Sequence, residues 1–137
     1  MWKVFWKYIL YTAGEEDYQN MIDMWISFGD GFLLVFALND PESFEALKTK
    51  HERVMKGSHN ETTPLILVGN KSDLENERKV DFQDAKKLAD SWKCEYIETS
   101  AKTNHNCKEA FEKLSTIILN KKLANDSNKK SCNCNIL

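Results

Sequence analysis

Two stretches of the chain, 32–38 and 64–69, are apolar at nearly every position. This pattern is typical of strands that are buried on both faces of a parallel sheet. Residues 2–10 and 95–99 are rich in aromatic and β-branched side chains and predict two further strands. The chain therefore offers four strands, each separated from the next by a longer stretch of different periodicity.

Between these strands, apolar residues recur every three or four positions, which predicts helices. The first helix is expected over 17–27, and the second starts at Pro41 and ends at Gly57. Asp40 and Asp81 are the expected N-caps of the second and third helices. Asn106 with Glu109 resembles a capping box that opens a last helix through Ile118.

Strands and helices thus alternate, which predicts an α/β fold: a partial doubly wound, mostly parallel sheet with helices on both faces. In such folds, ligands bind at the carboxyl ends of the strands. Candidate chemistry is therefore expected in the loops 12–17, 39–40, 70–73 and 100–103.

Length and composition fit this picture of one globular domain. The 137 residues are 42% hydrophobic and 29% charged, which is ordinary for a folded domain. A net charge of −2 provides no basic field to hold nucleic acid, so no nucleic-acid partner is expected. The cysteines and histidines have no metal-ligand spacing, so they predict no metal site.

Two motifs leave adjacent predicted strands directly. Asn70-Lys71-Ser72-Asp73 follows the apolar stretch 64–69, and Ser100-Ala101-Lys102 follows the strand at 95–99. With these residues the chain resembles the Ras-type small GTPases, over about 8–119. The stretches 16–21, 31–36 and 43–45 look most like the Ras/Rap branch.

The resemblance implies a role for each of these residues in binding the guanine base of GTP or GDP. Asp73 would accept two hydrogen bonds from guanine, a donor pair that adenine lacks. Asn70 would tie its loop to neighbouring loops, and Lys71 would lay its aliphatic stem along the base. The Ala101 N–H would donate to the guanine carbonyl, with Ser100 and Lys102 shaping that loop.

The resemblance also concerns the phosphate end of the nucleotide. Thr12-Ala13-Gly14 resembles the family's phosphate-sensing loop, in which the Gly14 N–H would meet the terminal phosphate. Glu15 stands where the family has a glutamine that orients the attacking water, so Glu15 is the candidate catalytic residue. Tyr11 stands where the family has an aspartate that holds Mg²⁺ through water.

No G-x-x-x-x-G-K-[ST] stretch, which cradles the phosphates in this family, occurs in the chain. The chain begins roughly where the family's third strand begins, so we expect the first β-α-β segment to be missing. Base contacts alone predict a nucleotide affinity no better than about millimolar and background GTP hydrolysis. Mg²⁺ is expected in the complete family site rather than in these residues.

From Asn120 onward the composition is polar, which predicts a GTPase-like domain over 1–120 and a flexible tail over 121–137. The tail ends Cys134-Asn135-Ile136-Leu137, a C-a-a-X pattern that favours geranylgeranylation of Cys134. Cys132 is a candidate for a second acylation. A lipid together with the lysines of the tail predicts attachment to the cytoplasmic face of a membrane, with the plasma membrane favoured.

Two functions follow from these observations. In the first, the chain belongs to a Ras-like GTPase that binds and hydrolyses GTP and signals at a membrane through Ras-type effector and regulatory proteins. In the second, the chain is a catalytically inactive, lipid-anchored interaction module that does not switch. The docking surface of such a module is expected at residues 16–25 and their neighbours.

Overall fold

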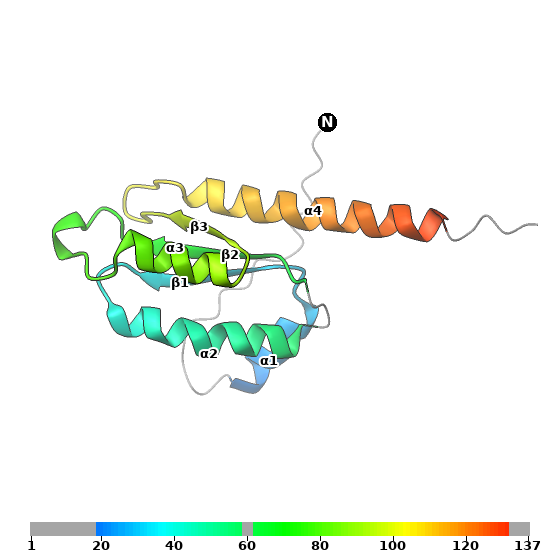
Figure 1. Ribbon diagram of the computed structural model, residues 1–137, viewed down its shortest axis with the longest axis horizontal. Coiled ribbons are helices and arrows are strands. Elements are labelled where there is room, and N and C mark those ends of the chain that lie inside the picture. The colour runs from blue at the N-terminus through cyan, green and yellow to red at the C-terminus, as the bar shows by residue number, and fades with distance from the viewer. Residues whose placement is uncertain (1–18, 59–61, 132–137) are drawn as a thin grey trace, which may run out of the picture.

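The computed structural model describes residues 19–58 and 62–131. The strand predicted at 2–10 and the loop at 12–17 lie outside these residues. The described elements run in the order α1 (Gln19–Phe28), β1 (Phe32–Ala37), α2 (Pro41–Gly57), β2 (Leu65–Asn70), η2 (Glu75–Glu77), α3 (Phe82–Ser91), β3 (Glu95–Glu98) and α4 (Cys107–Ser131). The three strands form one parallel sheet in the order β1-β2-β3 (Figure 1). The predicted α/β fold is confirmed.

Helices cover both faces of this sheet. In Figure 1, α4 lies above the sheet, and α2 and α1 lie below it. The larger core cluster joins α1, α2 and α3 to one face through residues such as Ile26, Leu47, Leu67 and Ala85. The smaller cluster joins α4 to the other face through Ile66, Val68, Ile97, Ala110 and Leu114. Alternate residues of β2 therefore feed two separate cores.

The two apolar strands differ in burial. Residues 65–69 of β2 are all buried, as their unbroken apolar pattern predicts. In β1, Leu34 and Phe36 are buried but Val35 is 46% exposed. The expectation that this strand is buried on both faces is therefore wrong for β1. Within the part of the chain that the structure describes, β1 pairs with β2 alone, and α4 packs over β2 and β3.

The helix starts differ in how they are capped. Asp40 caps α2 as predicted, because its carboxylate accepts hydrogen bonds from the Glu42 and Ser43 amides. Asp81 stands at the N-cap position of α3 but makes no side-chain cap hydrogen bond. Asn106 directly precedes α4, and its side-chain amide donates to the Glu98 carbonyl oxygen at 3.0 Å. Its backbone also adopts a left-handed conformation (φ 56°).

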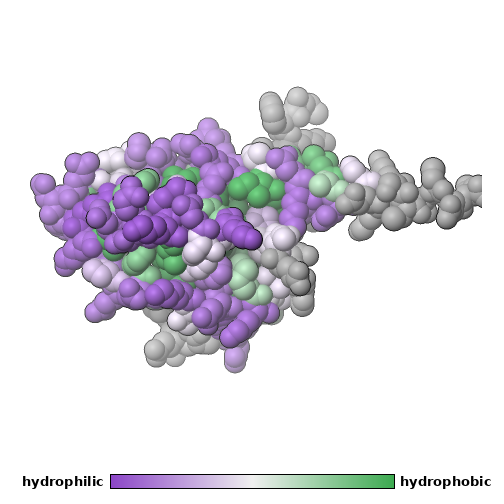
Figure 2. Space-filling view, in the orientation of Figure 1, coloured by the Kyte–Doolittle hydropathy of each residue, from purple (hydrophilic) through white to green (hydrophobic). Residues whose placement is uncertain are grey.

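α4 continues to Ser131, whereas composition placed the start of a flexible tail after Asn120. The first of the extra residues contact the domain: the Lys121 ammonium donates to the Thr62 carbonyl oxygen, and that of Lys122 pairs with Asp30. Farther along, Leu123 is 56% exposed. Figure 2 shows hydrophobic positions along α4 within a mostly hydrophilic surface. None of the described helices is long and apolar enough to cross a membrane.

The two-sided burial of β2 gives a stability prediction. Leu67 is fully buried, so Leu67→Ala removes core contacts and should lower the free energy of unfolding by about 2–5 kcal/mol. Leu123→Ala, at an exposed position of α4, should change it by no more than about 0.5 kcal/mol. Urea denaturation followed by circular dichroism measures both changes. Equal effects of the two variants would contradict the described core.

Candidate functional site

The two motif loops meet at one edge of the sheet. Asn70 is the last residue of β2, and the stretch 99–102 follows β3 directly. Because β2 and β3 are adjacent and parallel, with Gly69 paired to Glu98, both loops leave the sheet on the same side. The Ser72 N–H then donates to the Thr99 carbonyl oxygen at 3.0 Å. The structure thus brings together residues that are thirty positions apart in the sequence.

Ser100 is the buried centre of this junction. It is 1% exposed, and its hydroxyl donates to Asp73 Oδ1 at 2.6 Å. The Ser100 hydroxyl oxygen also accepts the Thr103 N–H at 3.2 Å. The Ser100 backbone N–H and carbonyl both pair with His105. A buried hydroxyl needs such partners, and here they fix the second loop against the first.

Asn70 makes the second connection between the loops. Its side-chain oxygen accepts the Ala101 N–H at 3.2 Å and the Thr99 hydroxyl at 3.3 Å. Its backbone carbonyl accepts the Leu38 N–H, which ties the site to the end of β1. The Ala101 N–H, for which the family resemblance implies a contact with guanine, thus donates to Asn70 in this structure.

Asp73 is held in the ionised state. The Ser100 hydrogen bond is the main cause that lowers the pKa of the Asp73 carboxyl group, opposed by some desolvation. The positive charges of Lys102 and Lys71 lower this pKa further. A carboxylate at neutral pH can only accept hydrogen bonds, so any group that binds Asp73 must supply donors.

Lys71 carries the backbone strain of the site. Its φ of 68° lies in the left-handed region, which costs a non-glycine residue about 1–2 kcal/mol. Its side chain is exposed, as is that of Lys102 on the other loop. Strained residues of this kind concentrate at ligand-binding sites, where the surrounding structure holds them in place.

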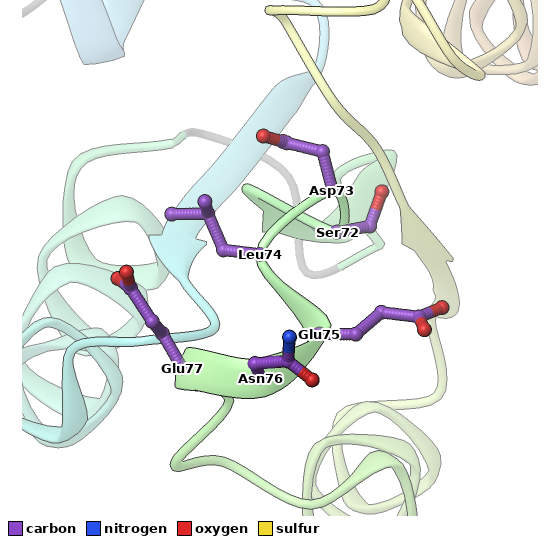
Figure 3. A pocket seen from close by; sticks show the side chains of 6 residues that line it. All are labelled: Ser72, Asp73, Leu74, Glu75, Asn76 and Glu77. Carbon is purple, nitrogen blue, oxygen red and sulfur yellow. The ribbon is translucent and has the colours of Figure 1, made fainter.

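An open hollow lies beside Asp73. Its lining comes from one continuous stretch, Ser72 to Glu77 (Figure 3). A second hollow lies between the same turn and the loop after β3, and it is lined by Ser72, Asp73, Glu75, Arg78, Glu98, Thr103, His105 and Asn106. Both hollows border Asp73, so the carboxylate faces space that a ligand can enter.

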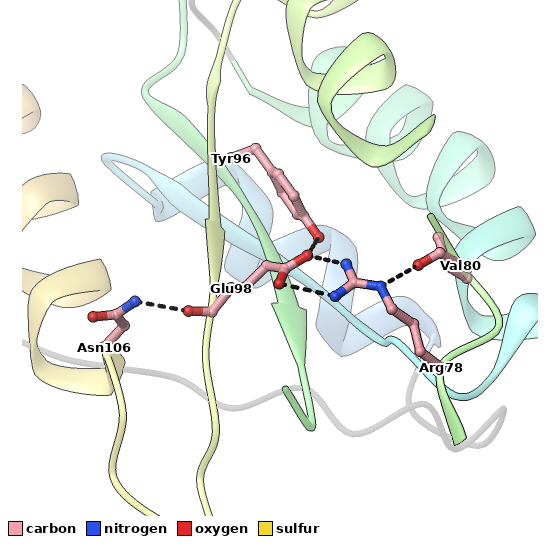
Figure 4. Close-up of polar contacts among 5 residues, drawn as sticks. All are labelled: Arg78, Val80, Tyr96, Glu98 and Asn106. Atoms are coloured by element: carbon pink, nitrogen blue, oxygen red, sulfur yellow. Dashed lines mark hydrogen bonds and ion pairs between the residues drawn. The ribbon is translucent and has the colours of Figure 1, made fainter. Parts of the chain in front are cut away.

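Some residues of the second hollow belong to a polar cluster that sequence patterns did not single out. The Arg78 guanidinium pairs with the Glu98 carboxylate through two nitrogens, and its Nε donates to the Val80 carbonyl at 2.9 Å (Figure 4). The Tyr96 hydroxyl donates to Glu98 Oε1 at 2.8 Å. Burial and the neighbouring carboxylate raise the pKa of Tyr96, so its hydroxyl stays protonated. The only feature of the sequence that could have pointed to this cluster is Glu98, a charged residue at the end of a predicted strand, two residues before Ser100.

Three sequence-predicted site residues, Gly14, Glu15 and Cys134, lie outside the described residues. Among residues 19–58 and 62–131, no group of three or more His, Cys, Asp or Glu side chains is arranged to hold a metal ion. The described residues therefore do not themselves fit Mg²⁺. At this edge of the sheet they present side-chain acceptors at Asn70 and Asp73 and a backbone donor at Ala101.

Comparison with known proteins agrees with this arrangement. The sequence profile of the Ras family matches residues 5–120. The ras-1 protein of Neurospora crassa is 46% identical over 103 residues, which cover 75% of this chain. The chain spans about half the length of that relative, since the aligned part is 48% of it. The parallel sheet, the two joined loops and the profile match together show that this chain belongs to the Ras family of small GTPases.

Proposed function

We propose that this chain recognises the guanine base of GTP and GDP through the loops that follow β2 and β3. The observation that carries the proposal is the Ser100–Asp73 hydrogen bond, which joins the two loops around an ionised carboxylate. The family membership of the chain supports the same ligand.

Asp73 is the specificity residue of this proposal. Guanine presents a ring N–H and an exocyclic amine side by side, and a carboxylate accepts both. Adenine presents no such pair, so its binding would leave a desolvated carboxylate without donors, which is unfavourable by about 1–3 kcal/mol or more. The preference for guanine over adenine therefore follows from the Asp73 carboxylate.

The other loop residues hold and frame the base. Lys71 and Lys102 carry long aliphatic stems on either loop, which can cover the faces of the ring. The Ala101 N–H would donate to the guanine carbonyl, sharing or replacing its contact with Asn70. Asn70 would keep its contact with the Thr99 hydroxyl and so hold the two loops together.

GTP hydrolysis and switching are proposals for the whole protein rather than for these loops. Gly14 and Glu15 are the candidates that would meet the terminal phosphate and the attacking water. Mg²⁺ would belong to that phosphate end. Effector and regulatory proteins of the Ras type are the proposed partners.

A partner-docking function is a second candidate, favoured by the exposed apolar side chains of α1. Met21, Met24 and Phe28 are 44%, 49% and 81% exposed, whereas Ile26 faces the core. Large apolar side chains that gather in one place mark interaction surfaces. Such docking serves a switching GTPase and a non-switching, lipid-anchored module equally well.

Membrane attachment through Cys134 is the remaining part of the proposal. The C-a-a-X pattern of the last four residues and the lysines of the tail support it. A prenyl group with basic residues nearby holds a protein at an anionic membrane surface, here the cytoplasmic face of the plasma membrane.

Asp73→Asn tests the base-recognition proposal. An asparagine presents one acceptor and one donor, which complements xanthine, whose carbonyl replaces the exocyclic amine of guanine. We expect the preference for GDP over XDP to fall by at least about tenfold and to approach reversal. Dissociation constants from NMR titration with GDP, XDP and ADP provide the measurement.

Asp84→Asn is the matched control, since Asp84 is an exposed aspartate that belongs to α3 and not to a motif loop. This variant should leave the order of nucleotide preference unchanged. A wild-type chain that binds ADP as well as GDP would overturn the assignment of Asp73.

Cys134→Ser tests the lipid proposal. The wild-type chain, incubated with a type I protein geranylgeranyltransferase and geranylgeranyl diphosphate, should gain one geranylgeranyl group in its intact mass. Cys134→Ser should gain none, and Cys132→Ser should gain the same group as wild type. Modification that persists in Cys134→Ser would refute the assignment.

A further inference from the structure

The Arg78–Glu98 pair adds a further connection between the segments that carry the two base loops. Arg78 lies five positions after Asp73, just beyond η2, and Glu98 lies two positions before Ser100. The loops themselves are joined by the Ser100–Asp73 hydrogen bond and by the contacts of Asn70. Outside them lies the two-pronged contact between the Arg78 guanidinium and the Glu98 carboxylate (Figure 4). This outer contact restrains the tilt of one loop against the other.

Each partner of the pair is itself anchored. Arg78 Nε donates to the Val80 carbonyl, and the Lys79 and Val80 amides donate to the Leu38 carbonyl oxygen. Glu98 is held at its side chain by Tyr96 and at its backbone by Asn106. The pair therefore links a segment fixed to β1 with a segment fixed to α4.

Gly69 on β2 makes room for this cluster. A Cβ atom at Gly69 would lie 2.6 Å from the Tyr96 hydroxyl oxygen and 3.0 Å from a Leu38 methyl group. Such a contact is too short, so a side chain at this position would displace the hydroxyl that supports Glu98. The glycine one residue before Asn70 thus allows Tyr96 to reach the carboxylate.

Partial burial makes the pair stronger than an ordinary surface ion pair. The side chains of Arg78 and Glu98 are 29% and 21% exposed. A two-pronged arginine–carboxylate contact also fixes geometry, which a single ammonium contact does not. The hydrogen bond to Glu98, and then the charge of that carboxylate, raise the pKa of Arg78, so its guanidinium stays charged.

We propose that Arg78 is a positioning residue for guanine recognition, which it supports by bracing Glu98 and hence the Ser100-Ala101-Lys102 loop against Asp73. This inference rests on the proposed function of the site. Arg78 acts through the loops, because its guanidinium nitrogens are already engaged by the Glu98 carboxylate and the Val80 carbonyl oxygen. It sets the alignment of Asp73 with the Ala101 amide, on which discrimination between bases depends.

The test combines nucleoside preference with local amide exchange. In Arg78→Ala we expect the ratio of adenosine to guanosine dissociation constants, measured by NMR titration, to fall by about threefold to thirtyfold. The amides of Ala101 and Thr103, which donate to Asn70 and Ser100, should exchange with solvent faster. Reversal of the pair in Arg78→Glu with Glu98→Arg should restore part of both effects.

Arg53→Ala is the matched control. Arg53 is 28% exposed at its side chain and pairs with Asp23 through one 2.6 Å contact between α2 and α1, away from both loops. It should leave the base preference and the exchange of these two amides unchanged. Arg78→Lys, which keeps the charge but not the two-pronged contact, serves if Arg78→Ala does not fold.

The outcomes separate this inference from the proposed function. A wild-type chain without guanosine preference refutes the proposed function, and the exchange of Ala101 and Thr103 still decides whether Arg78 braces the loop. Unchanged exchange in Arg78→Ala overturns the inference. An equal loss of affinity for guanosine and adenosine also overturns it, because Arg78 would then support the fold without aligning the base site.

Discussion

The hydrogen bond from the buried Ser100 hydroxyl to the Asp73 carboxylate is the contact on which the candidate site depends. It joins two loops that are far apart in sequence, and it lowers the pKa of the Asp73 carboxyl group. The Ser100 hydroxyl oxygen also accepts the Thr103 amide, which turns the hydroxyl proton toward Asp73. Without this contact, the Asp73 carboxylate would lose the buried donor that fixes its position between the loops.

The sheet brings the two motif loops close to each other, and side-chain contacts fix their relative orientation. Parallel pairing of β2 and β3 places Asn70 and Thr99 at the same edge. Asn70 and Ser100 join the loops directly, and the Arg78–Glu98 pair joins the segments next to them. The strain at Lys71 is tolerated because the loop is fixed on both sides.

Features that depend on local sequence were predictable. The unbroken apolar run of β2, the Asp40 cap and the positions of both motif loops follow from short-range patterns, and the structure agrees with each. Long-range features were not. The same apolar run in β1 leaves Val35 exposed, because the burial of a strand depends on which elements pack against it.

The Arg78–Glu98 pair is a second example of a contact that local sequence patterns do not predict. Arg78 and Glu98 are twenty positions apart, and neither position carries a pattern that names its partner. At Asn106, the side-chain amide donates to a distant acceptor, the Glu98 carbonyl oxygen, which no local pattern indicates. Family resemblance singled out the residues proposed to meet the ligand, whereas the Arg78–Glu98 pair was found only in the three-dimensional contacts.

The most direct test is a two-dimensional ¹H–¹⁵N NMR titration of the chain with guanosine and, separately, with adenosine. Guanosine carries no phosphate, so it probes the base loops alone. We expect guanosine to shift the amide signals of Asn70, Asp73 and Ala101 at markedly lower concentrations than adenosine does. Equal shifts with both nucleosides, or guanosine shifts confined to other parts of the chain, would contradict this expectation.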